Sequence, residues 1–253
     1  MYLYRMTFWE HLEELRGTLL RILLAVLAAA VMAFCFKDPL FSVVLAPISS
    51  DFITYRLFSA IAGTNFSLNE VGLINVELAQ QFLTHMKVAL WAGFLLVSPY
   101  VLYRLFRFVS PALYQNERRY AVGAVVGGYL MFVAGVLLNY FIIFPLAFRF
   151  LVSYQVSPDV VNMITLDSYI SNLLMLCFLM GVFFELPVVC WLLAKVGLLK
   201  ASAMARYRRH AIVLILVIAA IITPTADALT LTIVALPIYL LYEISLLIVR
   251  RTS

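Results

Sequence analysis

Long apolar runs separated by short charged segments make up most of this chain. A helix needs about 20 apolar residues to cross the hydrocarbon core of a bilayer. The runs predict spanning helices at residues 19–36, 82–106, 120–148, 168–194, 211–224 and 229–249. The fifth run is short, but charged residues flank it and the sixth as they would flank two spans, so we expect two short spans rather than a re-entrant hairpin. The pattern predicts one all-α integral membrane domain over residues 1–253, with six transmembrane helices.

The segments outside these runs carry patterns of their own. Thr7 and Glu10 have the spacing of a capping box, which predicts a cytoplasmic amphipathic helix within residues 1–18. Residues 37–81 form the only long segment between spans, and we expect short helices there that cap the outer face. In the third span, Gly123 and Gly127 form a GxxxG pair, which predicts close packing against another helix of the same chain more readily than dimerisation.

The composition supports a lipid environment. Only 12% of the 253 residues are charged, whereas soluble proteins have about 25%. The net charge of +5 does not indicate nucleic-acid binding, because no stretch interleaves basic and aromatic residues. The three cysteines lie in apolar runs without CxxC or Cys/His spacing, so we expect no metal and no cofactor. The partner that the composition implies is the lipid bilayer.

The distribution of basic residues predicts the orientation. Cytoplasmic segments of membrane proteins carry an excess of Lys and Arg. Of the 18 Lys and Arg residues, 14 flank one side of the predicted spans, and four lie on the other: Lys37, Arg56, Lys87 and Arg149. This asymmetry predicts that both termini are cytoplasmic.

Two acidic residues, Glu14 and Glu117, stand on the side where basic residues predominate. Each could simply favour the positive N-terminal end of a helix, and that role is compatible with a functional one. Two carboxylates on one inner surface are suited to bind a cationic ligand. Arginine matches best, because its planar guanidinium donates two parallel hydrogen bonds to a carboxylate.

Three further acids interrupt the apolar pattern. Glu185 lies ten residues before Lys195, so about 15 Å from the inner end of its helix, near the middle of the membrane. An ionisable group there is a functional hypothesis by default, and Pro187 beside it frees a backbone carbonyl. Asp227, at the outer turn before the last span, either caps that helix or has a functional role. Glu243 is expected to snorkel or to pair with a basic residue.

Several enzyme classes leave no trace in the sequence. It contains no GxxxxGK[ST] loop, no GxSxG turn and no HExxH; the nearest string to the last is His11-Leu12-Glu13-Glu14. We therefore expect a protein that is not an enzyme. Any transport would draw its energy from an ion gradient or the membrane potential.

Short strings in a fixed order resemble one family across about residues 7–249. These strings are His11–Arg16, Phe108–Arg119, Phe144–Ala147, Phe184–Pro187, Thr223-Pro224 followed by Asp227, Leu236-Pro237 and Tyr242–Ile244. Each string alone is weak, but their order, spacing and six-span topology together resemble the TatC family, the receptor subunits of the twin-arginine protein translocase.

The resemblance implies a cup-shaped bundle in a bacterial inner membrane that binds twin-arginine signal peptides and exports folded proteins with the proton-motive force. It also implies TatA- and TatB-like single-span subunits as partners, within an oligomeric complex. By position, the signal-peptide site would consist of Glu14, Arg16, Phe108, Pro111, Leu113, Tyr114 and Glu117. Glu185 and Pro187 would serve partner docking, and Pro47 and Asp227 would be periplasmic.

Two alternatives stand beside this interpretation. A proton-coupled secondary transporter of a small cation or solute would use Glu185 as its proton site, and the proline-broken helices and the mid-membrane acid support this alternative. The two halves of the sequence show no evident inverted repeat, which counts against it. A passive membrane scaffold would tolerate substitution of the inner acids with changes in stability alone.

Overall fold

The chain folds into long helices joined by shorter helices and short strands. The computed structural model describes residues 8–63, 72–109, 118–154, 157, 162–223 and 227–252. The long helices are α1 (Phe8–Phe34), α4 (Gln80–Val109), α5 (Arg118–Leu138), α7 (Leu166–Phe184), α10 (Arg208–Ile222) and α11 (Ala228–Thr252). Shorter helices are α2 (Lys37–Leu45), η1 (Ala46–Ile48), α3 (Ile53–Ala62), α6 (Phe144–Ser153), α8 (Leu186–Lys195) and α9 (Ala201–Arg206).

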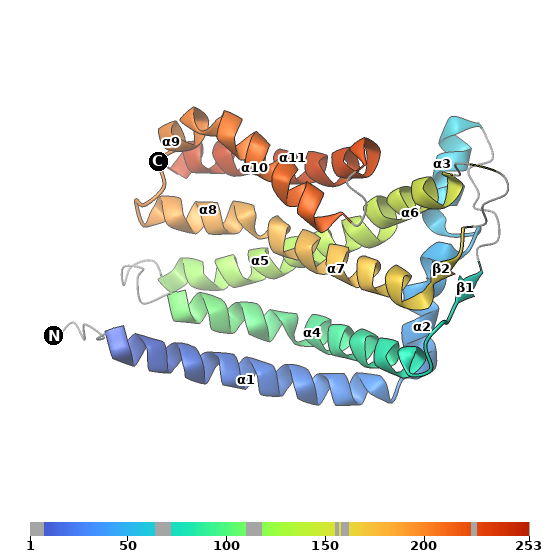
Figure 1. The fold of residues 1–253 in the computed structure, drawn as a ribbon. Coiled ribbons are helices and arrows are strands. Elements are labelled where there is room, and N and C mark those ends of the chain that lie inside the picture. The colour runs from blue at the N-terminus through green and yellow to red at the C-terminus, as the bar shows by residue number, and fades with distance from the viewer. Residues whose placement is uncertain are drawn as a thin grey trace.

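The bundle has two chemically different ends (Figure 1). The start of α1, the ends of α4, α8 and α11, and the starts of α5 and α10 lie at one end. We call it the basic end, because these helix termini carry Arg107, Arg118, Lys195, Arg208, Arg250 and Arg251. Helices α2 and α3 lie at the opposite end, which we call the outer end. The first and last described helices thus begin and finish on the same side.

Six helical segments are long and apolar enough to cross a membrane, but the set differs from the expected one. They are Leu12–Phe34, Lys37–Ile61, Gln80–Phe108, Val125–Ser153, Leu166–Lys195 and Ala228–Thr252. Lys37–Ile61 takes the place of the short fifth run, because α10 has only 15 residues. In Figure 1, α10 nevertheless runs along the bundle, while α2 and α3 lie at its outer end.

The lipid-facing character of the bundle shows in its surface. Large apolar side chains are exposed along several long helices, among them Leu24, Val31, Leu214, Ile221 and Leu236. Soluble monomers rarely expose continuous apolar area on this scale. The interior is apolar as well, so hydrocarbon is the solvent that matches this surface.

Prolines divide the spanning helices at defined points. Pro145 has no N–H, so the carbonyl four residues earlier, at Phe141, lacks its helical donor. The chain passes through a π-helical turn there, η4 (Asn139–Ile143), and Thr54 Oγ1 donates a hydrogen bond to the Phe141 carbonyl. In α4, Pro99 leaves the Leu95 carbonyl free in the same way, and Ser98 Oγ donates to it at 2.7 Å.

The outer loops contain a feature that the sequence did not predict. Strand β1 (Leu73–Ile74) pairs in parallel with β2 (Ile164–Thr165), and these two-residue strands join the first outer loop to the second. Extended backbone segments need hydrogen-bond partners, and the two loops provide them for each other. The short helices expected between residues 37 and 81 are present as α2, η1 and α3.

The glycine expectation for the third span is wrong in its position. A Cβ added to Gly123 or Gly127 would meet no described atom within 4 Å. The close approach lies further along α5 instead, where a Cβ at Gly135 would come within 2.5 Å of the Met180 carbonyl oxygen in α7. The GxxxG spacing indicates small residues on one face, but only packing decides which face meets a neighbour.

Candidate functional site

The first candidate site lies at the basic end, on the initial turns of α1. Glu14 is half-buried there, and its Oε2 atom is buried without a hydrogen-bond partner in the described part of the chain. Arg16 is exposed two residues further on, and Glu13 is exposed on the preceding position. A buried carboxylate oxygen is costly unless it accepts a hydrogen bond, and none of the described residues donates one to this atom of Glu14.

The loop between α4 and α5 is the second contributor expected at this site. Phe108, the penultimate residue of α4, is half-buried. Pro111, Leu113, Tyr114 and Glu117 lie outside the described residues. The two helix ends that flank this loop lie at the same end of the bundle as the start of α1 (Figure 1).

Glu185 lies where the long apolar segment Leu166–Lys195 breaks. It ends α7 and begins α8, and Pro187 follows it as a buried residue. Only 9% of the Glu185 surface is exposed, and neither carboxyl oxygen has a hydrogen-bond partner among the described residues. No hydrogen bond therefore joins Glu185 to Glu14 in the described part of the chain.

The two expected periplasmic residues make clear structural contacts. Pro47 is buried in η1, and its carbonyl oxygen accepts a hydrogen bond of 3.0 Å from the Tyr55 hydroxyl. Asp227 caps α11, because its carboxylate accepts from the backbone N–H groups of Leu229 and Thr230 and from the Thr230 hydroxyl. Of the two roles considered for Asp227, the capping role is the one with visible contacts.

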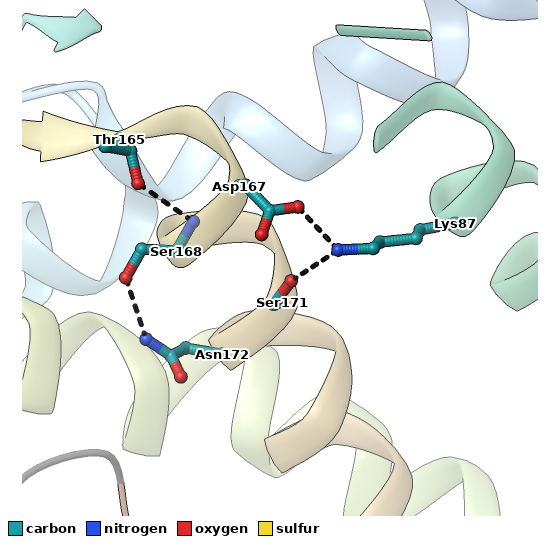
Figure 2. Close-up of polar contacts among 6 residues, drawn as sticks. All are labelled: Lys87, Thr165, Asp167, Ser168, Ser171 and Asn172. Atoms are coloured by element: carbon teal, nitrogen blue, oxygen red, sulfur yellow. Dashed lines mark hydrogen bonds and ion pairs between the residues drawn. The ribbon is translucent and has the colours of Figure 1, made fainter. Parts of the chain in front are cut away.

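A polar cluster at the outer end was missed by sequence reasoning. Lys87 of α4 donates to Asp167 Oδ1 at 2.5 Å and to Ser171 Oγ at 3.3 Å, both in the first turns of α7 (Figure 2). Thr165 caps the same helix by accepting from the Ser168 N–H. The signal that could have shown the cap is Thr165 directly before an apolar run with Ser168 three residues later, whereas no local pattern places Lys87, 80 residues from Asp167, beside it.

Glu243 pairs as expected. Its carboxylate accepts a hydrogen bond of 2.6 Å from Arg208 Nη2, and this ion pair joins α11 to the start of α10. It also accepts a hydrogen bond of 2.8 Å from the Tyr239 hydroxyl.

Asn139 is a buried polar residue that the sequence did not single out. It is fully buried in the π-helical turn, and its amide donates to Cys177 Sγ at 3.1 Å. A lone Asn inside the third apolar run was the signal for it.

The described part of the chain holds no group of three or more His, Cys, Asp or Glu side chains placed around a common point. The polar side chains that do gather are acids with basic or hydroxyl partners, or acids without any. Binding of a hydrogen-bond donor is the chemistry that such unpaired acids support.

Together, these features define a polytopic α-helical membrane protein in which Glu14 and Glu185 have buried carboxylate oxygens that no described residue satisfies. The family model described as "Sec-independent protein translocase protein (TatC)" matches residues 10–237. This chain belongs to the TatC family. That family is a protein translocase family and not a family of enzymes, and the membership disfavours the small-solute transporter interpretation.

Named relatives match along nearly their whole length. The Sec-independent protein translocase protein TatC of Blattabacterium sp. subsp. Periplaneta americana is 32% identical over 252 residues, covering 96% of this chain and 94% of that protein. The TatC protein of Aquifex aeolicus is 35% identical over 242 residues, covering 95% and 93%. A crystal structure described as a twin-arginine translocase receptor, TatC, superposes with a TM-score of 0.79 at 34% identity, covering 96% of this chain and 99% of the other.

Proposed function

We propose that this chain is the signal-peptide receptor of a twin-arginine translocase, with Glu14 and Glu117 as the two carboxylates that bind the paired arginines. The observation that carries the proposal is the Glu14 carboxylate, which has a buried oxygen without a described donor at the basic end. Glu117 directly precedes Arg118, the first residue of α5, whose start lies at that same end.

The chemistry of the site favours arginine over lysine. A guanidinium donates two parallel hydrogen bonds to one carboxylate, whereas an ammonium provides a compact charge without that geometry. The many basic residues at this end repel cations in general. Binding is therefore favourable only for a cationic ligand that contacts both carboxylates directly. Arg16, Phe108, Pro111, Leu113 and Tyr114 would shape the surface around the two acids.

The proposed setting follows from charge and topology. The basic end faces the cytoplasm of a bacterial inner membrane, with both termini inside, because 14 of the 18 basic residues belong to the segments on that side. Residues 37–81 then form a periplasmic cap over the outer end, which includes Pro47, and the short helix α10 acts as the fifth span. The energy for transport comes from an ion gradient or the membrane potential, and the family resemblance makes the proton-motive force the proposed source.

The proposed partners are TatA- and TatB-like single-span subunits in an oligomeric complex. Glu185 supports this, since a buried acid with two unpartnered oxygens can receive a hydrogen-bond donor from an apolar helix. Pro187 keeps the break between α7 and α8 that places Glu185 at a helix junction.

The direct test is peptide binding to the purified protein in nanodiscs. Labelled signal peptides with Arg-Arg and with Lys-Lys are titrated against wild type, the double variant Glu14→Ala, Glu117→Ala, and the control Glu13→Ala. Glu13 is an exposed acid on the same helix, so it controls for net charge. We expect Arg-Arg preference in wild type and in the control and its loss in the double variant. Unchanged preference in the double variant would refute the site.

A further inference from the structure

The second unpaired acid sits against a gap in the neighbouring helix. A Cβ built on Gly128 of α5 would lie 2.9 Å from Glu185 Oε2 and 3.3 Å from Oε1. Both oxygens of the carboxyl group are therefore placed over the bare backbone of Gly128. Any larger residue at this position would occupy the space that the carboxyl group now fills.

A third element closes this space. The same Cβ position is 3.0 Å from Phe106 Cε2, so the ring of Phe106 from α4 borders the gap on another side. Glu185 stands at the junction of α7 and α8, so the niche combines one residue from each of three neighbouring segments. We call Gly128, Phe106 and the carboxyl group of Glu185 the glutamate niche.

The niche supplies no donor. In the described part of the chain, both Glu185 oxygens are buried without a hydrogen-bond partner, and no described basic residue forms an ion pair with this carboxylate. An ionised carboxylate in such apolar surroundings is strongly disfavoured, while the neutral acid is tolerated. The packing around Glu185 and the apolar surroundings therefore both favour the neutral form of its carboxyl group.

We propose that Gly128 is a positioning residue for Glu185: the missing side chain opens the niche that receives the carboxyl group and keeps it neutral, dry and inside the bundle. This inference rests on the proposed function in taking Glu185 as the docking acid. Gly128 acts through Glu185 alone and contacts no ligand itself. A donor from a partner helix would find the carboxyl group at a fixed place.

The chain offers a matched pair of substitutions. At Gly128, an added methyl group meets only side-chain atoms among its three nearest neighbours, the Glu185 carboxyl group and the edge of the Phe106 ring, so Gly128→Ala displaces the carboxyl group without forcing backbone apart. At Gly127, the adjacent residue of the same helix, an added methyl group meets no described atom within 4 Å. Gly127→Ala therefore controls for helix propensity and hydrophobicity.

The test is infrared spectroscopy of the protein alone in nanodiscs at neutral pH. The band of the protonated Glu185 carboxyl group is assigned as the C=O stretch that is lost in Glu185→Gln. We expect wild type and Gly127→Ala to show the same band of a carboxyl group without hydrogen bonds. In Gly128→Ala the displaced group meets water, so the band moves to lower frequency or is replaced by a carboxylate band. Identical spectra for the two alanine variants would overturn the proposal.

A second variant covers the case in which Gly128→Ala does not fold. Phe106→Leu removes the bordering ring and adds no bulk at α5, so we expect the same spectral change from water entry. A wild-type-like band in Phe106→Leu would then refute the niche.

Crosslinking to the single-span partners in Glu185→Gln membranes tests docking separately. Normal crosslinking there would refute the docking role and leave the niche standing, while a carboxylate band in wild type would refute the niche alone.

Discussion

The acids of this protein differ sharply between the outer end and the rest of the bundle. At the outer end, Asp167 is paired with Lys87 and Ser171, and Asp227 accepts from three groups around the start of α11. At the basic end and inside the bundle, Glu14 and Glu185 have buried oxygens without a described donor. Carboxylates whose oxygens already accept hydrogen bonds stabilise the fold, whereas carboxylates with an oxygen that lacks a described donor can still bind a ligand that donates one.

Glu243 shows that position along the bundle does not by itself decide whether a carboxylate finds hydrogen-bond donors. It lies near the basic end, like Glu14, yet Arg208 and Tyr239 satisfy it. The number of donors around a carboxylate therefore distinguishes a structural acid from a candidate binding acid better than its place along the membrane axis. Substitutions at Glu14, at Glu243, at Asp227 and at the Lys87–Asp167 pair test this distinction.

The largest effect is expected at Glu14. Glu14→Gln keeps the shape of the side chain but removes its charge, and hydrogen bonds to charged groups contribute about 1.5–3 kcal/mol, or about a 10- to 150-fold change in affinity. We expect Arg-Arg peptide affinity to fall by that factor, with the melting temperature unchanged. Titration of the peptide into nanodisc-embedded protein measures it. An equal loss in Glu13→Gln would assign the effect to net charge instead.

Glu243→Ala should instead destabilise the fold. Arg208 and Tyr239 both lose an acceptor, and unsatisfied partly buried groups cost about 1–2 kcal/mol. We expect earlier heat-induced unfolding in detergent and unchanged Arg-Arg preference in the folded protein. Tyr239→Phe, which removes one of the two donors, should show a smaller shift. If folded Glu243→Ala lost its preference for Arg-Arg peptides, Glu243 would be a binding acid despite its donors, and the number of donors would not separate structural from binding acids.

Asp227→Ala removes the cap of α11 and should cost about 0.5–2 kcal/mol. Asn caps helices about as well as Asp, so Asp227→Asn should stay close to wild type. Comparison of the unfolding midpoints of the two variants measures the cap separately from the charge. Should Asp227→Asn lose transport while its stability is retained, the carboxylate would have a role beyond capping.

The smallest effect is expected at the Lys87–Asp167 pair. Both side chains are partly exposed, and such pairs contribute about 0.2–1 kcal/mol. Asp167→Asn should therefore shift the unfolding midpoint slightly, and the difference from wild type should shrink at high salt. Lys87→Met removes the other partner of the pair and should shift the unfolding midpoint by a similarly small amount. A large shift that salt does not affect would show that the pair is desolvated in the membrane.

Much of the fold could be predicted because its causes are local. Runs of apolar residues predict the helices α1, α4, α7 and α11, and their capping and basic residues predict where several of them end. The residue order of the family strings identified the family, which the comparisons confirm. The weakest points were the short fifth run and the Lys37–Ile61 segment, since length and hydropathy do not show whether a helix runs along a bundle or lies at its end.

The candidate site could be predicted in its residue types but not in its contacts. The sequence marked Glu14 and Glu185 as acids in unusual places and Asp227 as a possible cap. It could not show that Gly128 rather than Gly127 meets a neighbour, because a helix places adjacent residues about 100° apart and packing selects one of them. Nor could it show that Thr54 would reach the carbonyl that Pro145 leaves free.

The membrane class, the helical runs, the charge asymmetry and the family can all be recognised without coordinates. These depend on composition, on periodicity within one segment and on residue order. Which acids are satisfied, where two helices approach closely and how the outer loops join became visible in the folded chain. Those features depend on contacts between residues far apart in the chain, such as Lys87 with Asp167 or Gly128 with Glu185, and no local pattern specifies them.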